Sequence, residues 1–241
     1  ENVNSDGTYS YSTALTGSFT TPTIAAPVAT AATSLGSSSF VANWNAVPGA
    51  TGYVIDVSTT PFELLDIVGW NFPNNPDNNV ADLGITENSL KTLTTQGTNN
   101  PEYKPITLTP PLQSSITSVA TVEGNWNSEI NPKFWQIEFS TLGYNQLKLF
   151  SVQRSSPTGP RDFKAQYKVG EDGTWTDIPG ATTITLANDW STGVLNNISL
   201  PSDCNNQPSV FVRWILMSNI AVNGLSVAGG GTSAIDDVYI R

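Results

Sequence analysis

Two adjacent carboxylates, Asp236 and Asp237, are the strongest candidates for holding an ion in this 241-residue sequence. They lie in segment 234–240, whose alternating pattern predicts a β-strand. Successive strand residues point to opposite faces, so we expect only one carboxylate to face inward, where it needs a cation or several hydrogen-bond donors. A calcium ion would be such a partner. The alternative is a solvated Asp236 beside an Asp237 that caps backbone amides.

Two tryptophans in polar loops are candidates for binding sugar. Trp126 adjoins Asn125 in one loop, and Trp190 adjoins Asp189 in another. An aromatic ring can stack on the apolar face of a sugar while neighbouring amides and carboxylates hydrogen-bond to its hydroxyls. The alternative is that both tryptophans anchor their loops, as most sandwich tryptophans do. We expect that structural role for the tryptophans in strands and hairpins, which are Trp44, Trp135, Trp175 and Trp214.

Three acidic residues, Glu123, Glu129 and Asp162, are candidates for hydrolytic chemistry. A glycosidase needs two carboxylates at a fixed separation, and nothing in the sequence fixes one here. The chain has no histidine, which removes Ser-His-Asp triads, histidine-ligated zinc and a base for Cys204. We therefore expect no catalytic residue in this segment. Asp162 beside Arg161 is interpreted as a bidentate structural ion pair.

Composition excludes several classes of partner. The formal charge of −10, from 20 acidic and 10 basic residues, argues against binding nucleic acid. No run of about 20 apolar residues predicts insertion into a membrane. The single Cys204 cannot form an internal disulfide, which predicts a free or partly exposed thiol. The first residues lack a signal-peptide pattern, so we expect the export signal elsewhere in a secreted or outer-surface protein.

Short alternating segments separated by turn residues predict an all-β chain. No segment keeps a helical period over 11 residues, so we expect little helix. Many short strands of this kind favour an antiparallel β-sandwich with a jelly-roll arrangement. The predicted strands are 67–72, 116–122, 134–140, 146–153, 162–169, 182–186, 196–200, 209–217 and 234–240.

The N-terminal part divides from this sandwich. Phe40, Ala42 and Trp44 share one strand face, residues 53–57 predict a second strand, and Pro48 with Gly49 predicts the turn between them. This pattern resembles the first half of a fibronectin type III domain, in which the tryptophan is buried under Tyr53. We therefore expect a terminal strand remnant and linker at 1–22, a partial fibronectin-like domain at 23–62, and a jelly roll at 63–241.

The second block resembles secreted jelly-roll domains of multimodular bacterial surface proteins. The resemblance covers about 175 residues and rests on short motifs, among them 155–163, Arg213-Trp214-Ile215 and Ile235-Asp236-Asp237-Val238. Such domains accompany secreted nucleases, phosphoesterases and other hydrolases without supplying their active sites. Similar carbohydrate-binding jelly rolls hold a structural calcium through the second aspartate of the terminal strand. For this chain the resemblance implies Asp237 as a ligand, with Asn71 and Asp66 as companions.

These observations predict a non-catalytic extracellular module that serves adhesion, glycan binding or the spacing of a secreted hydrolase. Its expected partners are a polysaccharide or a protein of the cell surface or secretion machinery. The fibronectin-like motif beside a jelly roll also resembles cargo of the Bacteroidetes type IX secretion route. The alternatives are a structural subunit of a larger cell-surface assembly, and an accessory domain of a nuclease, phosphoesterase or glycoside hydrolase.

Overall fold

The structure is a computed structural model that describes residues 2–3, 9–10, 27–34, 36–53, 65–74, 77–105, 118–127 and 132–241. The chain divides into two compact units, Glu1–Phe62 and Glu63–Arg241. No helix of the described residues is long and apolar enough to cross a membrane.

The first unit contains two short antiparallel ribbons. One joins β1 (Asn2–Val3) to β2 (Tyr9–Ser10), and the other joins β3 (Ala29–Thr33) to β4 (Val41–Trp44). The rings of Trp44 and Tyr53 contact each other, with centroids 5.3 Å apart. The expectation that Trp44 is buried is wrong, because 38% of it is exposed. Among the described residues of this unit, the ribbon of β3 and β4 has no second sheet packed over the ring. Most of the strand predicted at 53–57 lies outside the described residues.

The second unit is built almost entirely from strands. Its helical elements among the described residues are two short 3-10 turns, η1 (Thr86–Asn88) and η2 (Ser202–Cys204), which confirms the expectation of little helix. The strands are β5 (Val68–Trp70), β6 (Leu83–Gly84), β7 (Thr94–Gln96), β8 (Glu102–Pro105), β9 (Ser118–Glu123), β10 (Phe134–Phe139), β11 (Lys148–Ser155), β12 (Asp162–Val169), β13 (Thr176–Asp177), β14 (Ile184–Thr185), β15 (Gly193–Ser199), β16 (Val210–Leu216) and β17 (Thr232–Ile240).

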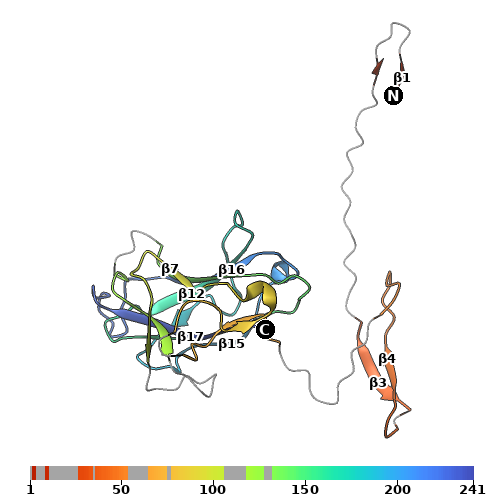
Figure 1. Ribbon diagram of the computed structural model, residues 1–241, viewed down its shortest axis with the longest axis horizontal. Coiled ribbons are helices and arrows are strands. Elements are labelled where there is room, and N and C mark those ends of the chain that lie inside the picture. The colour runs from red at the N-terminus through yellow and green to blue at the C-terminus, as the bar shows by residue number, and fades with distance from the viewer. Residues whose placement is uncertain are drawn as a thin grey trace. The chain divides into compact units, whose positions relative to one another are not determined.

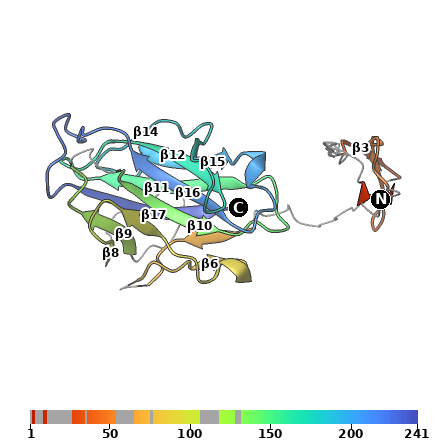
Figure 2. The same ribbon diagram turned by 90° about the horizontal axis from the view of Figure 1, so that it is seen from above.

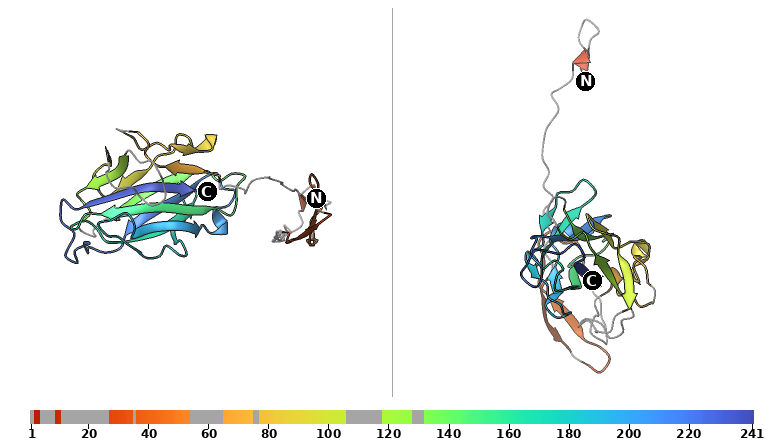
Figure 3. Two further views of the ribbon diagram at one scale, coloured as in Figure 1. Left: turned by 90° about the horizontal axis from the view of Figure 1, so that it is seen from below. Right: turned by 90° about the vertical axis from the view of Figure 1, so that its left-hand side faces the viewer.

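These strands form two antiparallel sheets. The seven-stranded sheet runs β15-β11-β17-β5-β6, with β9 pairing along the rest of β17 and β8 pairing with β9. The six-stranded sheet runs β13-β12-β16-β10-β7, with β14 beside β12. In Figure 1, β7, β12 and β16 lie in the upper layer of this unit, and β15 and β17 in the lower. Seen from below in the left panel of Figure 3, β17 (dark blue) crosses the middle of its sheet.

The connections between the sheets define a jelly-roll sandwich. Strands β10, β11 and β12 alternate between the six-stranded and seven-stranded sheets, and β15, β16 and β17 alternate in the same way. Figure 2 shows the two sets of strands superimposed when the unit is viewed from above. The predicted fold class, an all-β antiparallel sandwich, is confirmed.

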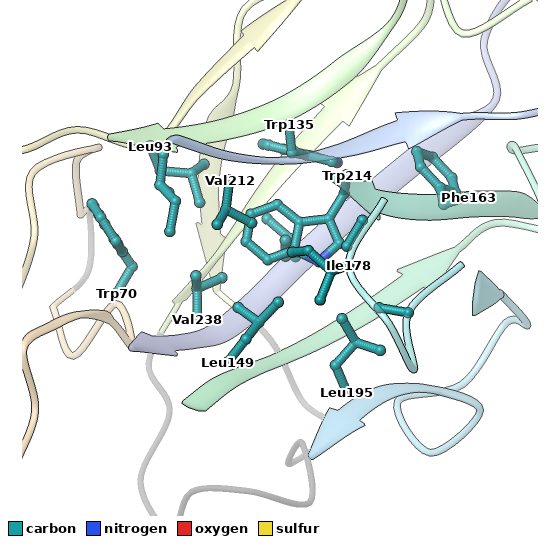
Figure 4. Close-up of a cluster of buried hydrophobic side chains, with 14 of the residues drawn as sticks. Trp70, Leu93, Trp135, Leu149, Phe163, Ile178, Leu195, Val212, Trp214 and Val238 are labelled. Atoms are coloured by element: carbon teal, nitrogen blue, oxygen red, sulfur yellow. The ribbon is translucent and has the colours of Figure 1, made fainter. Parts of the chain in front are cut away.

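The core lies between the two sheets, and strand β16 shows which of its residues contribute to it. In β16, Val210, Val212 and Trp214 belong to the core cluster, while the intervening Arg213 is half-buried on the outer side. This alternation is the period-two pattern of a strand covered on one face. Figure 4 shows residues from both sheets, including Trp135, Leu149, Trp214 and Val238, projecting into the space between the layers.

Two tryptophans also tie the sheets together by hydrogen bonds. The indole N–H of Trp135 donates to Ser233 Oγ at 3.2 Å, and that of Trp214 donates to Ser151 Oγ at 3.1 Å. In each pair the tryptophan comes from the six-stranded sheet and the serine from the seven-stranded sheet. All four residues are fully buried, so each bond satisfies a polar atom that would otherwise be costly to bury. The structural role expected of Trp135 and Trp214 is confirmed.

Candidate functional site

A polar cleft opens on the outer face of the seven-stranded sheet. In β9, Ala120 and Val122 belong to the main core, whereas Val119 and Thr121 line the cleft, so the cleft lies on the side of the sheet away from the six-stranded sheet. Its volume is about 280 Å³. The lining comes from β8, β9, β11 with the residue after it, β17 and the loop before β15. It consists of Lys104, Pro105, Val119, Thr121, Arg154, Ser155, Ser156, Asn188, Trp190, Thr232 and Ala234.

One wall of the cleft is formed by Arg154 and Asn188. Arg154 donates from Nε and Nη2 to Asn188 Oδ1, at 3.1 and 2.7 Å. The loop that carries Asn188 is fastened by Asp189, whose Oδ1 accepts the backbone N–H groups of Ser191 and Thr192 at 2.8 and 2.7 Å. Burial raises the pKa of Asp189, but the bonds from Thr192 and Ser191 outweigh it, so the net shift is downward. The guanidinium therefore sits in a defined orientation at the cleft.

The floor of the cleft is apolar. Trp190 packs with Val119, Val152 and Ala234 in a small cluster outside the main core, and Val194 covers its side. Only 5% of Trp190 is exposed, so the flat face of its ring is not open for stacking on a sugar. Its indole N–H is buried and has no hydrogen-bond partner among the described residues.

The predicted sugar-binding residues divide between two places. Trp190 lines the cleft, but Asp189 caps its own turn and does not line it. The interpretation of Trp126 as a stacking platform is wrong, because it is fully buried in the core and its ring packs edge-on against Phe163 at 5.6 Å. The neighbouring Asn125 donates to Asn99 Oδ1 at 2.6 Å and is also outside the cleft. The loop that carries Trp126 places this side chain in the core, although the polar residues around Trp126 predict an exposed loop.

The paired aspartates of β17 are both fully buried. The alternative of a solvated Asp236 is therefore wrong, and a β-bulge interrupts the alternation on which the expectation of one inward carboxylate depends. The register between β11 and β17 shifts between Phe150 and Val152, and Asp237 has a φ of 47°. A bulge inserts one extra residue into a strand, so two consecutive side chains need no longer point to opposite faces.

Electrostatics keep Asp236 neutral in the metal-free protein. Its Oδ1 accepts the backbone N–H of Asp237 at 2.7 Å, while its buried Oδ2 has no hydrogen-bond partner among the described residues. Burial, followed by the charge of Asp237, raises the pKa of Asp236 to about 9. The hydroxyl of Tyr239 donates to Asp237 Oδ1 at 3.3 Å.

The companions expected for calcium fit unequally. Asn71 directly follows β5, whose Trp70 pairs with Val238, so the register places Asn71 opposite the bulge. The Oδ1 atom of Asn71 is buried and has no hydrogen-bond partner among the described residues. Asp66 does not fit, because the Nε atom of Arg241 donates to its Oδ1 at 2.5 Å.

Calcium takes six to eight oxygen ligands, and buried carboxylate and amide oxygens are of the required type. Asp236, Asp237 and Asn71 therefore fit such an ion. Within the described ranges, no three side chains of histidine, cysteine, aspartate or glutamate are grouped to hold a metal. The remaining ligands would have to be carbonyl groups or water.

The carboxylates considered for hydrolysis are dispersed. Asp162 lies on β12 of the six-stranded sheet and Glu123 on β9 of the other, while Glu129 lies outside the described residues. Arg161 donates to both carboxylate oxygens of Asp162, at 2.7 and 3.1 Å, so the interpretation of a bidentate ion pair is confirmed. Hydrogen bonds from Arg161 lower the pKa of Asp162, which makes this carboxyl a poor proton donor at neutral pH.

Sequence reasoning missed most of the cleft. Arg154 falls one residue beyond the predicted strand 146–153, and Asn188 stands beside the predicted pair of Asp189 and Trp190 without being selected. Thr121 and Thr232 are single threonines on separate strands. What these residues share is the outer face of the seven-stranded sheet. Recognising this requires the sheet order β9-β17-β11, which no local sequence pattern predicts.

The fold and site thus define an antiparallel β-sandwich with a polar outer-face cleft. No protein-family model matches the chain, and no curated protein matches it. Solved structures similar to it include the enzymatically active domain of tailspike protein 4 of bacteriophage CBA120, at 10% identity and a TM-score of 0.38, over 62% of this chain. This chain spans about a fifth of that one, at 19%.

Two carbohydrate-binding modules are also similar. One is the family 30 module of the cellulosomal cellulase Cel9D-Cel44B of Clostridium thermocellum, at 11% identity and a TM-score of 0.36, over 74% of this chain and 98% of that one. The other is TmCBM61, solved with β-1,4-galactotriose, at 10% identity and a TM-score of 0.34, over 63% and 87%. Scores this low assign no function, which has to be inferred from the side chains at the cleft.

Proposed function

We propose that this chain is a non-catalytic glycan-binding module of a secreted protein and that it binds saccharide in the outer-face cleft. The observation that carries the proposal is the cleft lining, in which Arg154 and Asn188 face hydroxyl side chains above an apolar floor. This combination of groups supports the proposal.

The chemistry of the lining suits a saccharide. The guanidinium donates to sugar hydroxyls, while the side-chain amide and the hydroxyls of Thr121 and Thr232 can both donate and accept. Val119 and Ala234 supply apolar contacts for the C–H groups of a sugar ring. A small number of placed polar groups around an apolar base is the usual composition of a ligand site. With the ring of Trp190 almost covered, binding would depend on hydrogen bonds rather than on stacking.

A hydrolytic function has weaker support. Asp162 is held by Arg161 and by the hydroxyl of Ser218 at 2.5 Å, and neither it nor Glu123 lines the cleft. A glycosidase acts through two carboxylates on either side of one bond. Among the described residues that line the cleft there is no carboxylate to cleave a bound saccharide.

We also propose that Asp236 and Asp237 hold a structural calcium ion. Support comes from the buried Oδ2 of Asp236 and Oδ1 of Asn71, which have no hydrogen-bond partners among the described residues. When bound, the ion would favour the ionised form of Asp236 and balance the charge of both carboxylates in the interior. Its expected role is to stabilise β17, which also contributes Thr232 and Ala234 to the cleft.

Isothermal titration of the whole chain with a panel of neutral and acidic polysaccharides tests the glycan proposal. We expect saturable heat with at least one of them. The variant Asn188→Ala should weaken that binding, because it removes the acceptor that orients Arg154. The matched control is Asn196→Ala, since Asn196 is an exposed asparagine of β15 outside the cleft lining. Absence of heat with every polysaccharide, or equal losses in both variants, would contradict the proposal.

A further inference from the structure

The charge of the cleft differs from that of the chain. The chain carries 20 acidic and 10 basic residues, yet the described residues that line the cleft include two basic ones and no acidic one. All ten basic residues lie in the described ranges. Six of them form ion pairs with carboxylates, namely Lys91, Lys104, Lys164, Lys168, Arg161 and Arg241. The other four are Lys133, Lys148, Arg154 and Arg213.

Three of these four cations have an evident structural use or lie away from a cleft. Lys133 is buried and donates to backbone carbonyl groups. Arg213 stacks on the ring of Trp175 at 4.0 Å and donates to Gln166 Oε1 at 2.7 Å. Lys148 donates to the exposed Ser199 at 2.7 Å and does not line the cleft. Arg154 remains as the cation that faces a cleft without a carboxylate partner among the described residues.

The guanidinium of Arg154 is oriented by Asn188 and keeps N–H groups that make no hydrogen bond to the described residues. Of its five N–H groups, one on Nε and one on Nη2 are used by the single oxygen Asn188 Oδ1. Three N–H groups remain, including both on Nη1. Because Asn188 is neutral, it orients the guanidinium without cancelling its charge. A fixed guanidinium fork matches the two oxygens of a carboxylate or a sulfate better than it matches isolated hydroxyls.

The charge of Lys104, the second cation of the lining, is partly balanced by nearby carboxylates. Lys104 pairs with Glu102 at 2.6 Å and lies 3.9 Å from Glu123 at the rim. The net charge of −10 also repels anions at long range. A ligand anion therefore gains most by contact with Arg154, and selectivity arises inside the cleft rather than by steering.

We propose that the cleft selects saccharides that carry an anionic group, a carboxylate or a sulfate, and that Arg154 binds this group. The inference rests on the glycan-binding function proposed above and adds the class of ligand. A neutral saccharide occupying the same cleft would leave the Arg154 charge partly desolvated and without a counterion, which is unfavourable.

The test compares tri-galacturonate with its methyl ester, which has the same sugar backbone without charge. Titration calorimetry at low ionic strength should show the acid binding about tenfold more tightly or better, as expected for a charge-assisted contact. The advantage should shrink as sodium chloride is raised, because salt screens an accessible ion pair. A sulfated oligosaccharide in a third arm distinguishes recognition of sulfate from recognition of carboxylate.

Variants assign the effect to Arg154. Arg154→Gln should abolish the preference for the acid while the melting temperature stays within a few degrees. The side chain is half-buried, and within the described ranges its hydrogen bonds go to Asn188 alone. The control Lys148→Gln removes another cation of β11 outside the cleft and should leave the preference intact. If Arg154→Gln fails to fold, Arg154→Lys, which keeps the charge and loses the fork, should weaken the acid more than the ester.

The possible outcomes separate the two proposals. Equal affinity for acid and ester overturns the selectivity and leaves glycan binding in place. A preference that survives Arg154→Gln overturns the role of Arg154. Binding of neutral saccharides alone overturns the anionic class. Absence of binding by the acid, the ester, the sulfated sugar and the neutral panel overturns the glycan-binding function itself.

Discussion

The variant Asp236→Asn tests whether Asp236 is protonated in the folded, metal-free protein. In metal-free protein the pKa of Asp236 is raised to about 9 by burial and by Asp237. Asparagine resembles the protonated acid in shape, and its Oδ1 can still accept the N–H of Asp237. The substitution therefore removes the titration while keeping the hydrogen bond.

The pH dependence follows from the raised pKa. Below about pH 4 the carboxyl group is protonated in both the folded and the unfolded chain, so its full contribution to stability is present there. Between about pH 4 and 9 the unfolded chain is ionised and the folded chain is not, so unfolding releases a proton. Each pH unit in that window lowers the free energy of unfolding by about 1.4 kcal/mol. From pH 5 to 8 the wild type should lose about 4 kcal/mol relative to the variant.

The assay is urea unfolding followed by tryptophan fluorescence in EDTA at pH 5, 6, 7 and 8. The wild type should lose stability steadily against Asp236→Asn, and the exposed control Asp172→Asn should track the wild type. Excess calcium should reverse the order at pH 8, because calcium competes with the proton for Asp236 and stabilises the folded state by mass action. Parallel pH profiles of wild type and Asp236→Asn in EDTA would refute the reasoning.

Three shorter predictions concern the sandwich itself. Trp214→Phe and Ser151→Ala should each lower the free energy of unfolding, and their double-mutant cycle should give a coupling of about 1 kcal/mol, since they share one buried hydrogen bond. Independent effects would contradict that bond. Cys204 is fully buried, and burial raises its thiol pKa to about 12, so iodoacetamide at pH 8 should label it in urea but not in native protein. Gly231→Ala should destabilise the chain by about 2 kcal/mol, because its Cβ atom would lie 2.4 Å from a backbone oxygen, whereas Gly230→Ala should be nearly neutral.

The long strands of the sandwich could be predicted from sequence because they alternate. Strand β12 was predicted at 162–169 and runs from Asp162 to Val169. The sequence does not predict the short strands β6, β7 and β8. A segment such as Thr94–Gln96 has no apolar alternation, and it becomes a strand because it pairs with β10. Edge strands of this kind are fixed by tertiary contacts rather than by local propensity.

The site was predicted less well than the fold, for physical reasons that particular residues show. Burial of Trp126 depends on the path of its loop into the core, and the polar neighbours of Trp126 suggest the opposite. The single thiol of Cys204 is free as expected but fully buried rather than partly exposed. The bulge at Asp237 breaks the alternation on which the one-inward expectation depended. The cleft brings together Arg154, Thr121 and other residues that are far apart in the chain. Its lining could be predicted only with knowledge of the strand order in the sheet.

Glycan binding in the outer-face cleft can be tested most directly by NMR on the tryptophan indole groups. Trp190 lines the cleft, whereas Trp126 donates to the Val122 carbonyl in the core and Trp175 stacks on Arg213 in the six-stranded sheet. Titration of ¹⁵N-labelled protein with a saccharide that binds in calorimetry should shift the indole N–H signal of Trp190. The signals of Trp126 and Trp175 should stay in place. Shifts at Trp175 without a shift at Trp190, under saturating saccharide, would contradict a binding site in the cleft.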